Sequence, residues 1–473
     1  MQKFQLIILL TVSWFAQAQT LLSSRTYHID KPQRNGQLNA FANESSNEFY
    51  VVAGREKEIT AYKYNRALFF SDSLSTENEL RQAYPKFVGN TFDQSGNPVA
   101  YYADDSFDKF TALKFDFEKK QVDRSKLDLS FLSSDLLGTL QAKNHVCFLS
   151  SKSGLGDENR LVLNTIRDTI VGIATLDFTP YEILDHNGKI ISVKELLREY
   201  PIEFIDNRFF VPLAVASAKT KAYIDEKNLI ITFDHRPEET QVFSIDVTSG
   251  VVTHEIIPHQ NLTAEAAQSN SFYYDRRLFQ FKLNEDELVL QSASLQDKSN
   301  VTTYSATSKS TLQFINSALS MQVGNKPVRE FKNTEKFLKK ASKATAALTV
   351  YKTPDHLLVT AGAVRNIASS EDVALGILSI GLGAAVGSVD VPEMGKSNIQ
   401  SFYFESLFDD SFIHQPVTQT PLAIDLITQF MTENRKSITL DSVIWYQGNY
   451  ILSYYDKNKQ SFELRKFEDY RRY

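Results

Sequence analysis

Two-strand units recur along this chain, and they constrain its fold more than any other feature. Each unit has an apolar run typical of a β-strand, a short polar turn and a second run in which apolar and polar residues alternate. Polar turns such as 284–286 and 456–459 lie where strands must reverse. Recurrent hairpins of this kind predict an all-β protein. The seven units begin at Phe49, Val99, Val146, Leu229, Leu278, Leu357 and Tyr450.

The spacing of these units favours one circular array. Successive units start 47 to 93 residues apart, and three intervals of 47 to 50 residues match the length of a β-propeller blade. The longer intervals carry insertions. The sequence therefore predicts one β-propeller-like domain over residues 19–473, with six to eight blades, short inserted helices and an insertion at about 364–398. The stretch 27–42 is expected to add a strand to the last blade and close the ring. The alternative is two domains that divide near 258–269 or 326–347.

Residues 1–18 have the pattern of a secretory signal peptide. Lys3 gives the positive start, residues 6–14 are mainly apolar, and Ala16-Gln17-Ala18 matches a signal peptidase site. We expect cleavage after Ala18 and export to the periplasm or the extracellular space. No cysteine stands at the cleavage site after the apolar stretch, so no lipid anchor is expected. Outside the cytosol there is no pool of ATP or nicotinamide, which argues against chemistry that depends on them.

Charge and cysteine content narrow the partners further. The net charge of −6 offers no excess of cations for a phosphate backbone, so nucleic acid is not an expected partner. The single cysteine, Cys147, lies in an apolar run, where we expect a buried and inert thiol. Residues 390–397 end in Gly-Lys-Ser as a P-loop does, but Asp390 stands where that motif needs its first glycine. No nucleotide is therefore expected.

Helices are predicted only as insertions among the strands. Capping boxes at 76–79 and 192–195 predict two short helices. Thr420 before Pro421 predicts a third helix start, and the apolar stripe over 422–431 is expected to pack on the core. A basic helix is predicted over 334–347, with its lysines on a solvated face.

The most unusual segment lies inside the sixth unit. Residues 373–389 are 17 consecutive uncharged residues that hold four of the chain's 18 glycines. A helix of that length reaches only about 25 Å, short of the roughly 30 Å of hydrocarbon in a bilayer. We expect burial against the segment's own domain; an interaction flap and, less favoured, membrane contact are the alternatives. Such a flap would present Val373, Leu375, Ile377, Leu378, Ile380, Leu382 and Val386.

Motifs for catalysis and metal binding are incomplete. His254 and His259 are one residue too far apart for the zinc motif HExxH, so both are expected to be surface or turn residues. No GxSxG nucleophile elbow occurs. No cofactor or metal site is therefore predicted. Acidic clusters are expected to be hairpin turns, with calcium as the alternative ligand. The clusters are Asp104, Asp105 and Asp108; Asp116 and Glu118; 284–287; and Asp409 and Asp410.

These observations favour an exported, non-enzymatic binding or scaffold protein that uses its propeller loops to hold a protein or a glycan. One alternative is an exported hydrolase or lyase that acts on glycans or peptides, with carboxylates at the mouth of the channel. A second alternative is a membrane-associated assembly factor. The sequence assigns no catalytic residue.

Overall fold

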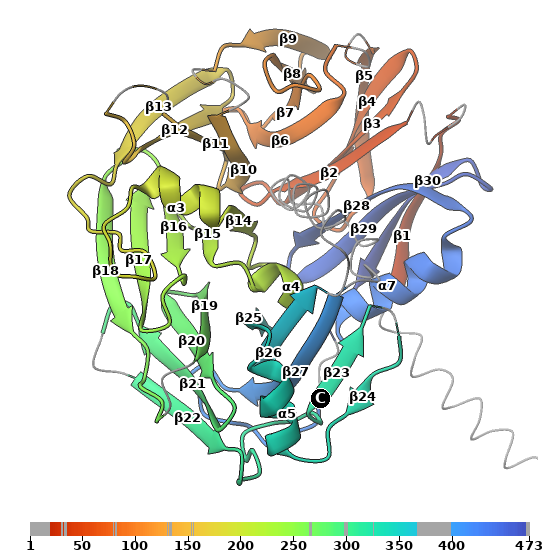
Figure 1. Ribbon diagram of the computed structural model, residues 1–473. Coiled ribbons are helices and arrows are strands. Elements are labelled where there is room, and N and C mark those ends of the chain that lie inside the picture. Colours follow the sequence, from red (N-terminus) through yellow and green to blue (C-terminus); the bar gives the residue numbers. More distant parts are fainter. Residues whose placement is uncertain are drawn as a thin grey trace, which may run out of the picture.

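Strands dominate the structure, and they form seven sheets that stand around one axis (Figure 1). The computed structural model describes residues 19–469 apart from 30–31, 33–35, 79, 81–82, 130, 132–134, 153, 155, 264–266, 298–300, 325 and 367–398. The protein is a seven-bladed β-propeller. This confirms the predicted all-β, propeller-like class. The expected signal peptide and the apolar segment 373–389 lie outside the described residues.

Each blade is a sheet whose innermost strand lies nearest the axis (Figure 1). From the axis outward, blade 1 has β2 (Gln37–Asn43), β3 (Glu48–Arg55), β4 (Glu58–Tyr64) and β5 (Phe70–Glu77); blade 2 has β6 (Lys86–Phe92), β7 (Pro98–Ala103), β8 (Phe110–Asp116) and β9 (Gln121–Leu127); blade 3 has β10 (Leu136–Ala142), β11 (His145–Ser151), β12 (Arg160–Arg167) and β13 (Ile170–Asp177). Blade 4 has β14 (Ile202–Ile205), β15 (Thr220–Asp225), β16 (Asn228–Phe233), β17 (Glu239–Asp246) and β18 (Val252–Pro258); blade 5 has β19 (Gln268–Tyr274), β20 (Arg277–Leu283), β21 (Glu287–Ser294) and β22 (Val301–Thr307). Blade 6 has β25 (Thr345–Lys352), β26 (Leu357–Asn366), β27 (Ile399–Phe408), β23 (Ser320–Val323) and β24 (Arg329–Glu330); blade 7 has β28 (Ile438–Tyr446), β29 (Asn449–Asp456), β30 (Ser461–Phe467) and β1 (Gln19–Thr26).

The seven predicted two-strand units are the paired central strands of the seven blades. These strands are buried on both faces, as in β7, where all six residues are buried. The outer strands alternate between exposed and covered residues, as in β9 and β22. The strong apolar runs therefore revealed the middle of each blade and not its edges. The units are β3–β4, β7–β8, β11–β12, β16–β17, β20–β21, β26–β27 and β29–β30.

The apolar core lies in layers between adjacent blades. Phe110 of blade 2 meets Phe148 of blade 3 edge to face, with ring centroids 5.2 Å apart. Tyr62 of blade 1 meets Phe462 of blade 7 in the same way, also at 5.2 Å. Each sheet thus contributes one face to each of two layers, and a blade without a neighbour would expose an apolar face.

The N-terminal strand closes the ring. β1 pairs antiparallel with β30 and becomes the outer strand of blade 7. The Arg25 guanidinium lies 3.4 Å from the ring centroid of Phe70 in blade 1, and the amide of Tyr27 donates to the carbonyl of Gln460 at 2.9 Å. The predicted closing stretch, 27–42, is wrong, because Gln37–Asn43 is the innermost strand of blade 1. β1 itself was not predicted, because an exposed edge strand carries few apolar residues.

The short helices follow the predicted caps only in part. α3 (Val193–Glu199) begins as expected, with the Ser192 side chain accepting from the amide of Glu195. The predicted helix start at Thr76 is wrong, since Thr76 and Glu77 belong to β5 and pair with β4. α4 (Leu213–Ala216) was not predicted, because its single turn is too short to show a helical period.

Two longer helices precede the inner strands of blades 6 and 7. α5 (Thr334–Ala341) buries Phe337, Leu338 and Ala341 as predicted, but it ends before β25. Its predicted extension to residue 347 is wrong, because the alanine-rich stretch pairs with β26. α7 (Ala423–Asn434) is capped by Leu422 and not by Thr420, since Asp425 accepts from the Leu422 amide. Its predicted apolar stripe packs on blades 6 and 7.

The segment that runs from α3 to β15, and that includes the innermost strand of blade 4, occupies the centre of the ring. This channel loop, residues 202–219, contains β14 and α4, which lie inside the ring (Figure 1). β14 pairs in parallel with β15, and Asn207 Nδ2 donates to the carbonyl of Tyr273 in blade 5 at 3.4 Å. The amide of Phe210 donates to the Tyr450 hydroxyl of blade 7 at 3.2 Å, and the Phe210 ring meets Tyr351 of blade 6.

A glycine in blade 3 makes room for a side chain of the channel loop. A Cβ added at Gly138 of β10 would lie 2.2 Å from Cε2 of Phe204. No side chain larger than hydrogen fits there without displacing the Phe204 ring. The loop therefore touches blades 3 to 7 and is part of the core of the molecule.

A buried ion pair of blade 4 is hydrogen-bonded to blade 5. Lys221 and Asp234 are fully buried, and Lys221 Nζ lies 2.7 Å from Asp234 Oδ2. Lys221 Nζ also donates to Asn270 Oδ1 at 2.7 Å, and Ser271 Oγ donates to Asp234 Oδ2 at 2.9 Å. The Thr240 hydroxyl donates to Asp234 Oδ1 at 2.7 Å. Removing one partner of such a pair costs about 3–5 kcal/mol, because the other charge is left buried.

We predict that Gly138→Ala destabilises the protein by about 1–3 kcal/mol, because the new methyl group overpacks Phe204. Urea unfolding measures this loss. The double variant Gly138→Ala/Phe204→Leu should lose less than the sum of the two single variants, because the smaller side chain makes room. Full additivity of the two substitutions would contradict this packing.

We predict that His259 makes the fold sensitive to acid. Burial lowers the pKa of His259 to about 3, whereas an unfolded histidine titrates near 6.5. Between these values the unfolded chain binds the extra proton, so stability falls as pH falls, by at most about 1.4 kcal/mol per pH unit. Urea unfolding from neutral pH down to pH 4 should show a shallower loss in His259→Gln. The exposed control, His186→Gln, should keep the wild-type slope.

Candidate functional site

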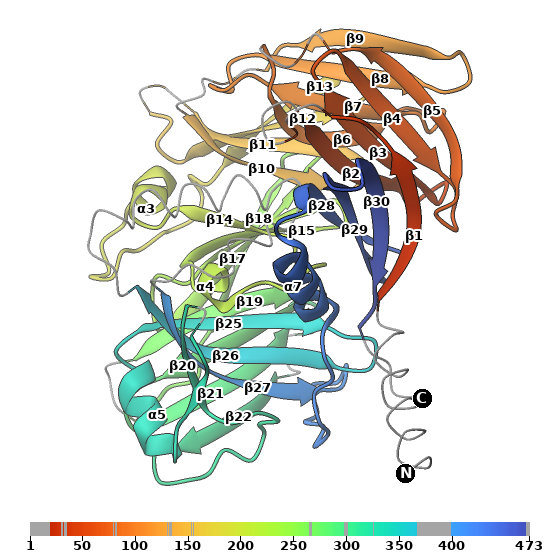
Figure 2. The same ribbon diagram turned by 90° about the vertical axis from the view of Figure 1, so that its right-hand side faces the viewer.

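One face of the ring gathers the connections between blades. Antiparallel strands alternate in direction, so the turn between the paired central strands of a blade lies at the same end as the connection to the next blade. This connection face carries α3, α4 and α5, which lie on the left in Figure 2. Loops of this kind are the usual place for binding residues, since the strands beneath hold them in position.

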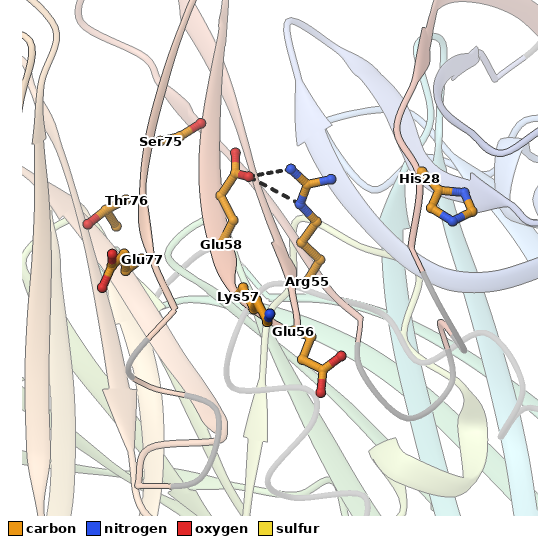
Figure 3. A pocket seen from close by; sticks show the side chains of 8 residues that line it. All are labelled: His28, Arg55, Glu56, Lys57, Glu58, Ser75, Thr76 and Glu77. Atoms are coloured by element: carbon orange, nitrogen blue, oxygen red, sulfur yellow. Dashed lines mark hydrogen bonds and ion pairs between the residues drawn. The ribbon is translucent and has the colours of Figure 1, made fainter.

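A charged hollow opens on the connection face where blade 7 meets blade 1. Its volume is about 660 Å³, which is within the size range of ligand sites. Three segments form its walls: the turn from β3 to β4, the end of β5, and the connection that follows β1 (Figure 3). The charged hollow is lined by His28, Arg55, Glu56, Lys57, Glu58, Ser75, Thr76 and Glu77.

An ion pair fixes the first wall. Arg55 and Glu58 face each other across the turn, and Arg55 Nε donates to Glu58 Oε2 at 3.2 Å. These hydrogen bonds from Arg55 lower the pKa of Glu58. The Thr60 hydroxyl donates to Glu58 Oε1 at 3.0 Å, and the Arg55 guanidinium lies 5.3 Å from the ring centroid of Tyr27. Both charged groups are therefore held in place before any ligand arrives.

The second wall is tied to the first through Asn78. Its amide donates to the carbonyl of Lys57 at 3.0 Å, and its Nδ2 donates to the carbonyl of Arg55 at 2.7 Å. Ser75 Oγ and Thr60 Oγ1 lie 2.9 Å apart across the ladder. These bonds set the spacing between Lys57 on one wall and Glu77 on the other.

The third wall comes from the seam that closes the ring. His28 Nδ1 lies 3.1 Å from Oε1 of Gln460, which belongs to the turn between β29 and β30. The charged hollow therefore exists only when the two ends of the chain are joined in blade 7. Its lining carries both signs of charge on rigid strand ends, which suits ion pairs with a polar ligand of mixed charge.

The sequence did not single out this hollow. The turn Arg55-Glu56-Lys57-Glu58 has alternating charges directly after an apolar strand, and that was the one local signal. His28 and residues 75–77 give none, because their proximity depends on ring closure. The predicted flap residues, Val373 to Val386, lie outside the described residues, so the structure does not place them.

The acidic clusters form hairpin turns, as predicted. Asp104 Oδ1 accepts from the amides of Asp108 and Lys109 at 2.8 and 3.1 Å. Asp409 Oδ1 likewise accepts from the amides of Ser411 and Ile413, both at 2.9 Å. Across the described ranges, no group of three or more His, Cys, Asp or Glu side chains is placed to hold a metal ion. Calcium stays an alternative ligand of these turns.

The remaining predicted residues lie in the core or against it. Burial raises the pKa of Cys147 to about 12, as expected of an inert thiol. His254 stacks on Phe243 with centroids 4.4 Å apart. The expectation that His259 is a surface or turn residue is wrong, since only 5% of it is exposed. None of the helices in the described part of the chain combines the length and apolar character that a membrane crossing requires.

The alternative prediction of a hydrolase or lyase expects carboxylates at the mouth of a channel. Two carboxyl groups lie on the channel loop. Asp206 pairs with Arg208, with Oδ2 and Nη2 at 2.6 Å. Glu203 is different, because its buried Oε1 has no hydrogen-bond partner within the described structure. Burial raises the pKa of Glu203 to about 7.

Solved structures that are similar to this chain include two prolyl peptidases and a lyase. A prolyl endopeptidase aligns over 93% of this chain at 7% sequence identity with a TM-score of 0.32, and this chain spans only 51% of it. Prolyl oligopeptidase B of Galerina marginata aligns over 93% of this chain and 52% of its own length, at 9% identity and a TM-score of 0.32. An oligogalacturonate lyase in complex with manganese aligns over 96% and 97% of the two chains, at 8% identity and a TM-score of 0.34. At these identities the likeness concerns the fold alone.

No protein-family model and no curated protein sequence matches the chain significantly.

Proposed function

We propose that this chain is an exported binding protein that holds a peptide segment of mixed charge in the charged hollow. The observation that carries the proposal is the lining itself, in which acidic and basic side chains surround one opening of about 660 Å³. A segment with both charges can pair with both signs of the lining, whereas a segment of one charge meets repulsion from half of it.

The architecture supports a binding role on this face. The channel loop packs against blades 3 to 7, so the centre of the ring is occupied by the chain's own residues. The connection face then offers its loops and the charged hollow to a partner. This role also agrees with the positions of Arg55 and Glu58, which are held by hydrogen bonds before binding.

We expect the mature chain, residues 19–473, to bind a fluorescent peptide of alternating lysine and glutamate more tightly than all-lysine or all-glutamate peptides of equal length. Fluorescence anisotropy measures the affinity. Lys57→Gln/Glu77→Gln should weaken binding about tenfold, because two partly exposed ion pairs are lost without a change in net charge. Binding should also weaken with added salt.

The matched control is Glu226→Gln/Lys227→Gln. It removes the same two residue types from the turn between β15 and β16, at the end of blade 4 opposite the connection face. This control should bind the alternating peptide as the wild type does. Equal affinity for the three peptides, or equal loss in both double variants, would refute the role of the charged hollow.

A second candidate function, a hydrolase or lyase for glycans or peptides, is favoured by Glu203. A carboxyl group with a pKa of about 7 suits general acid–base catalysis, and this one lies inside the ring without a partner among the described residues. Soluble polysaccharides and peptides, assayed for new reducing ends, unsaturated products and free amines, test this candidate. Glu203→Gln should lower any such activity at least about 100-fold. Product formation that survives this substitution would exclude Glu203 as the catalytic group.

A further inference from the structure

Three lysines gather in the seam between blades 4 and 5 on the connection face. Lys219 and Lys221 lie at the start of β15, and Lys282 lies on β20, which faces them across the seam. Lys221 is neutralised by the buried carboxylate of Asp234. His259, also in the seam, adds no charge at neutral pH, because burial lowers its pKa to about 3. The positive charges of Lys219 and Lys282 remain.

Neither of these two lysines has a close anionic partner. Lys219 Nζ donates to the carbonyl of Ser269 at 2.6 Å, which is an uncharged acceptor. The Lys282 side chain is only 8% exposed; within the described part of the chain its Nζ makes no hydrogen bond or ion pair, and the Nζ itself keeps contact with solvent. Glu238 is the charged group that acts on Lys282, but its side chain is 61% exposed and pairs with Arg236 at 3.5 Å. Burial lowers the pKa of Lys219 to about 8 and lowers that of Lys282.

Ser269 brings the two lysines to one place. It lies directly opposite Lys282 in the ladder of β19 and β20, and its carbonyl holds the Lys219 ammonium. Its hydroxyl is buried, and in the described structure it has no hydrogen-bond partner. An unpartnered buried hydroxyl costs free energy. One oxyanion would satisfy all three groups, since each of them can donate a hydrogen bond.

We propose that Lys219, Lys282 and Ser269 form a binding site for a small tetrahedral oxyanion, either inorganic phosphate or the phosphate group of a ligand. Lysine binds such groups as a point charge, and the serine hydroxyl supplies a directional donor. Binding to the folded chain alone stabilises it by mass action. This site lies three blades away from the charged hollow and does not depend on the proposed function.

Thermal unfolding of the mature chain at neutral pH tests this site, with increasing sodium phosphate and with sodium chloride to keep the ionic strength constant. The wild type should gain about 2 °C or more, and the gain should saturate. Lys282→Met should show no response to phosphate, because one of the two cations of the site is gone. Lys336→Met, on the exposed face of α5, should respond as the wild type does.

Ser269→Ala is the second variant, because it removes the unpartnered hydroxyl at little cost to folding. Calorimetric titration with phosphate should show about tenfold weaker binding than in the wild type. Phenyl phosphate separates the two sources of the anion: a Lys282-dependent response to it assigns the site to a ligand's phosphate group, and a response to inorganic phosphate alone assigns it to the free anion. No response in the wild type, or an equal response in Lys282→Met, would overturn the proposal.

Discussion

The ring depends on one constraint: each sheet must bury two apolar faces. Strands such as β7 have no polar face to turn to water, so a blade is stable only between two neighbours. The last layer, between blades 7 and 1, forms when β1 pairs with β30 and sets Tyr27 and Arg25 against Tyr62 and Phe70. Closure is therefore a requirement of core burial, and the charged hollow at this seam is a consequence of it.

The seam between blades 4 and 5 differs from the others in its polarity. Most seams are filled by aromatic and aliphatic side chains, whereas this one adds Lys221, Asp234 and Asn270 to its apolar part. Polar groups in a core need partners with good geometry, which restricts how the two sheets can slide against each other. The restriction matters here because the channel loop ends at this seam. Its last residue, Lys219, is followed directly by β15, which carries Lys221.

The sequence predicted what short-range patterns determine and missed what depends on the whole ring. The paired central strands carry continuous apolar runs, so all seven hairpins and the propeller class were predictable. β1 was missed because edge strands are polar. The end of α5 was misplaced because the alanines that follow it favour a helix, whereas in the fold they form β25 and pair with β26. The lining of the charged hollow was invisible for a different reason: His28 and Glu77 are brought together by closure, which no local pattern encodes.

The channel loop determines where this propeller can present its chemistry. A propeller with an open centre can place catalytic groups around its axis. Here the side chains of Phe204 and Phe210 pack in that space, and the missing side chain of Gly138 leaves room for Phe204. Asp206, which also lies on the loop, pairs with Arg208 of the same loop. Glu203 is partly exposed on this loop, but its Oε1 is buried and has no hydrogen-bond partner in the described structure. The charged hollow, in contrast, is open, and its walls are strand ends held by the closed ring. The loops of the connection face are therefore better placed than the ring centre to hold a large ligand.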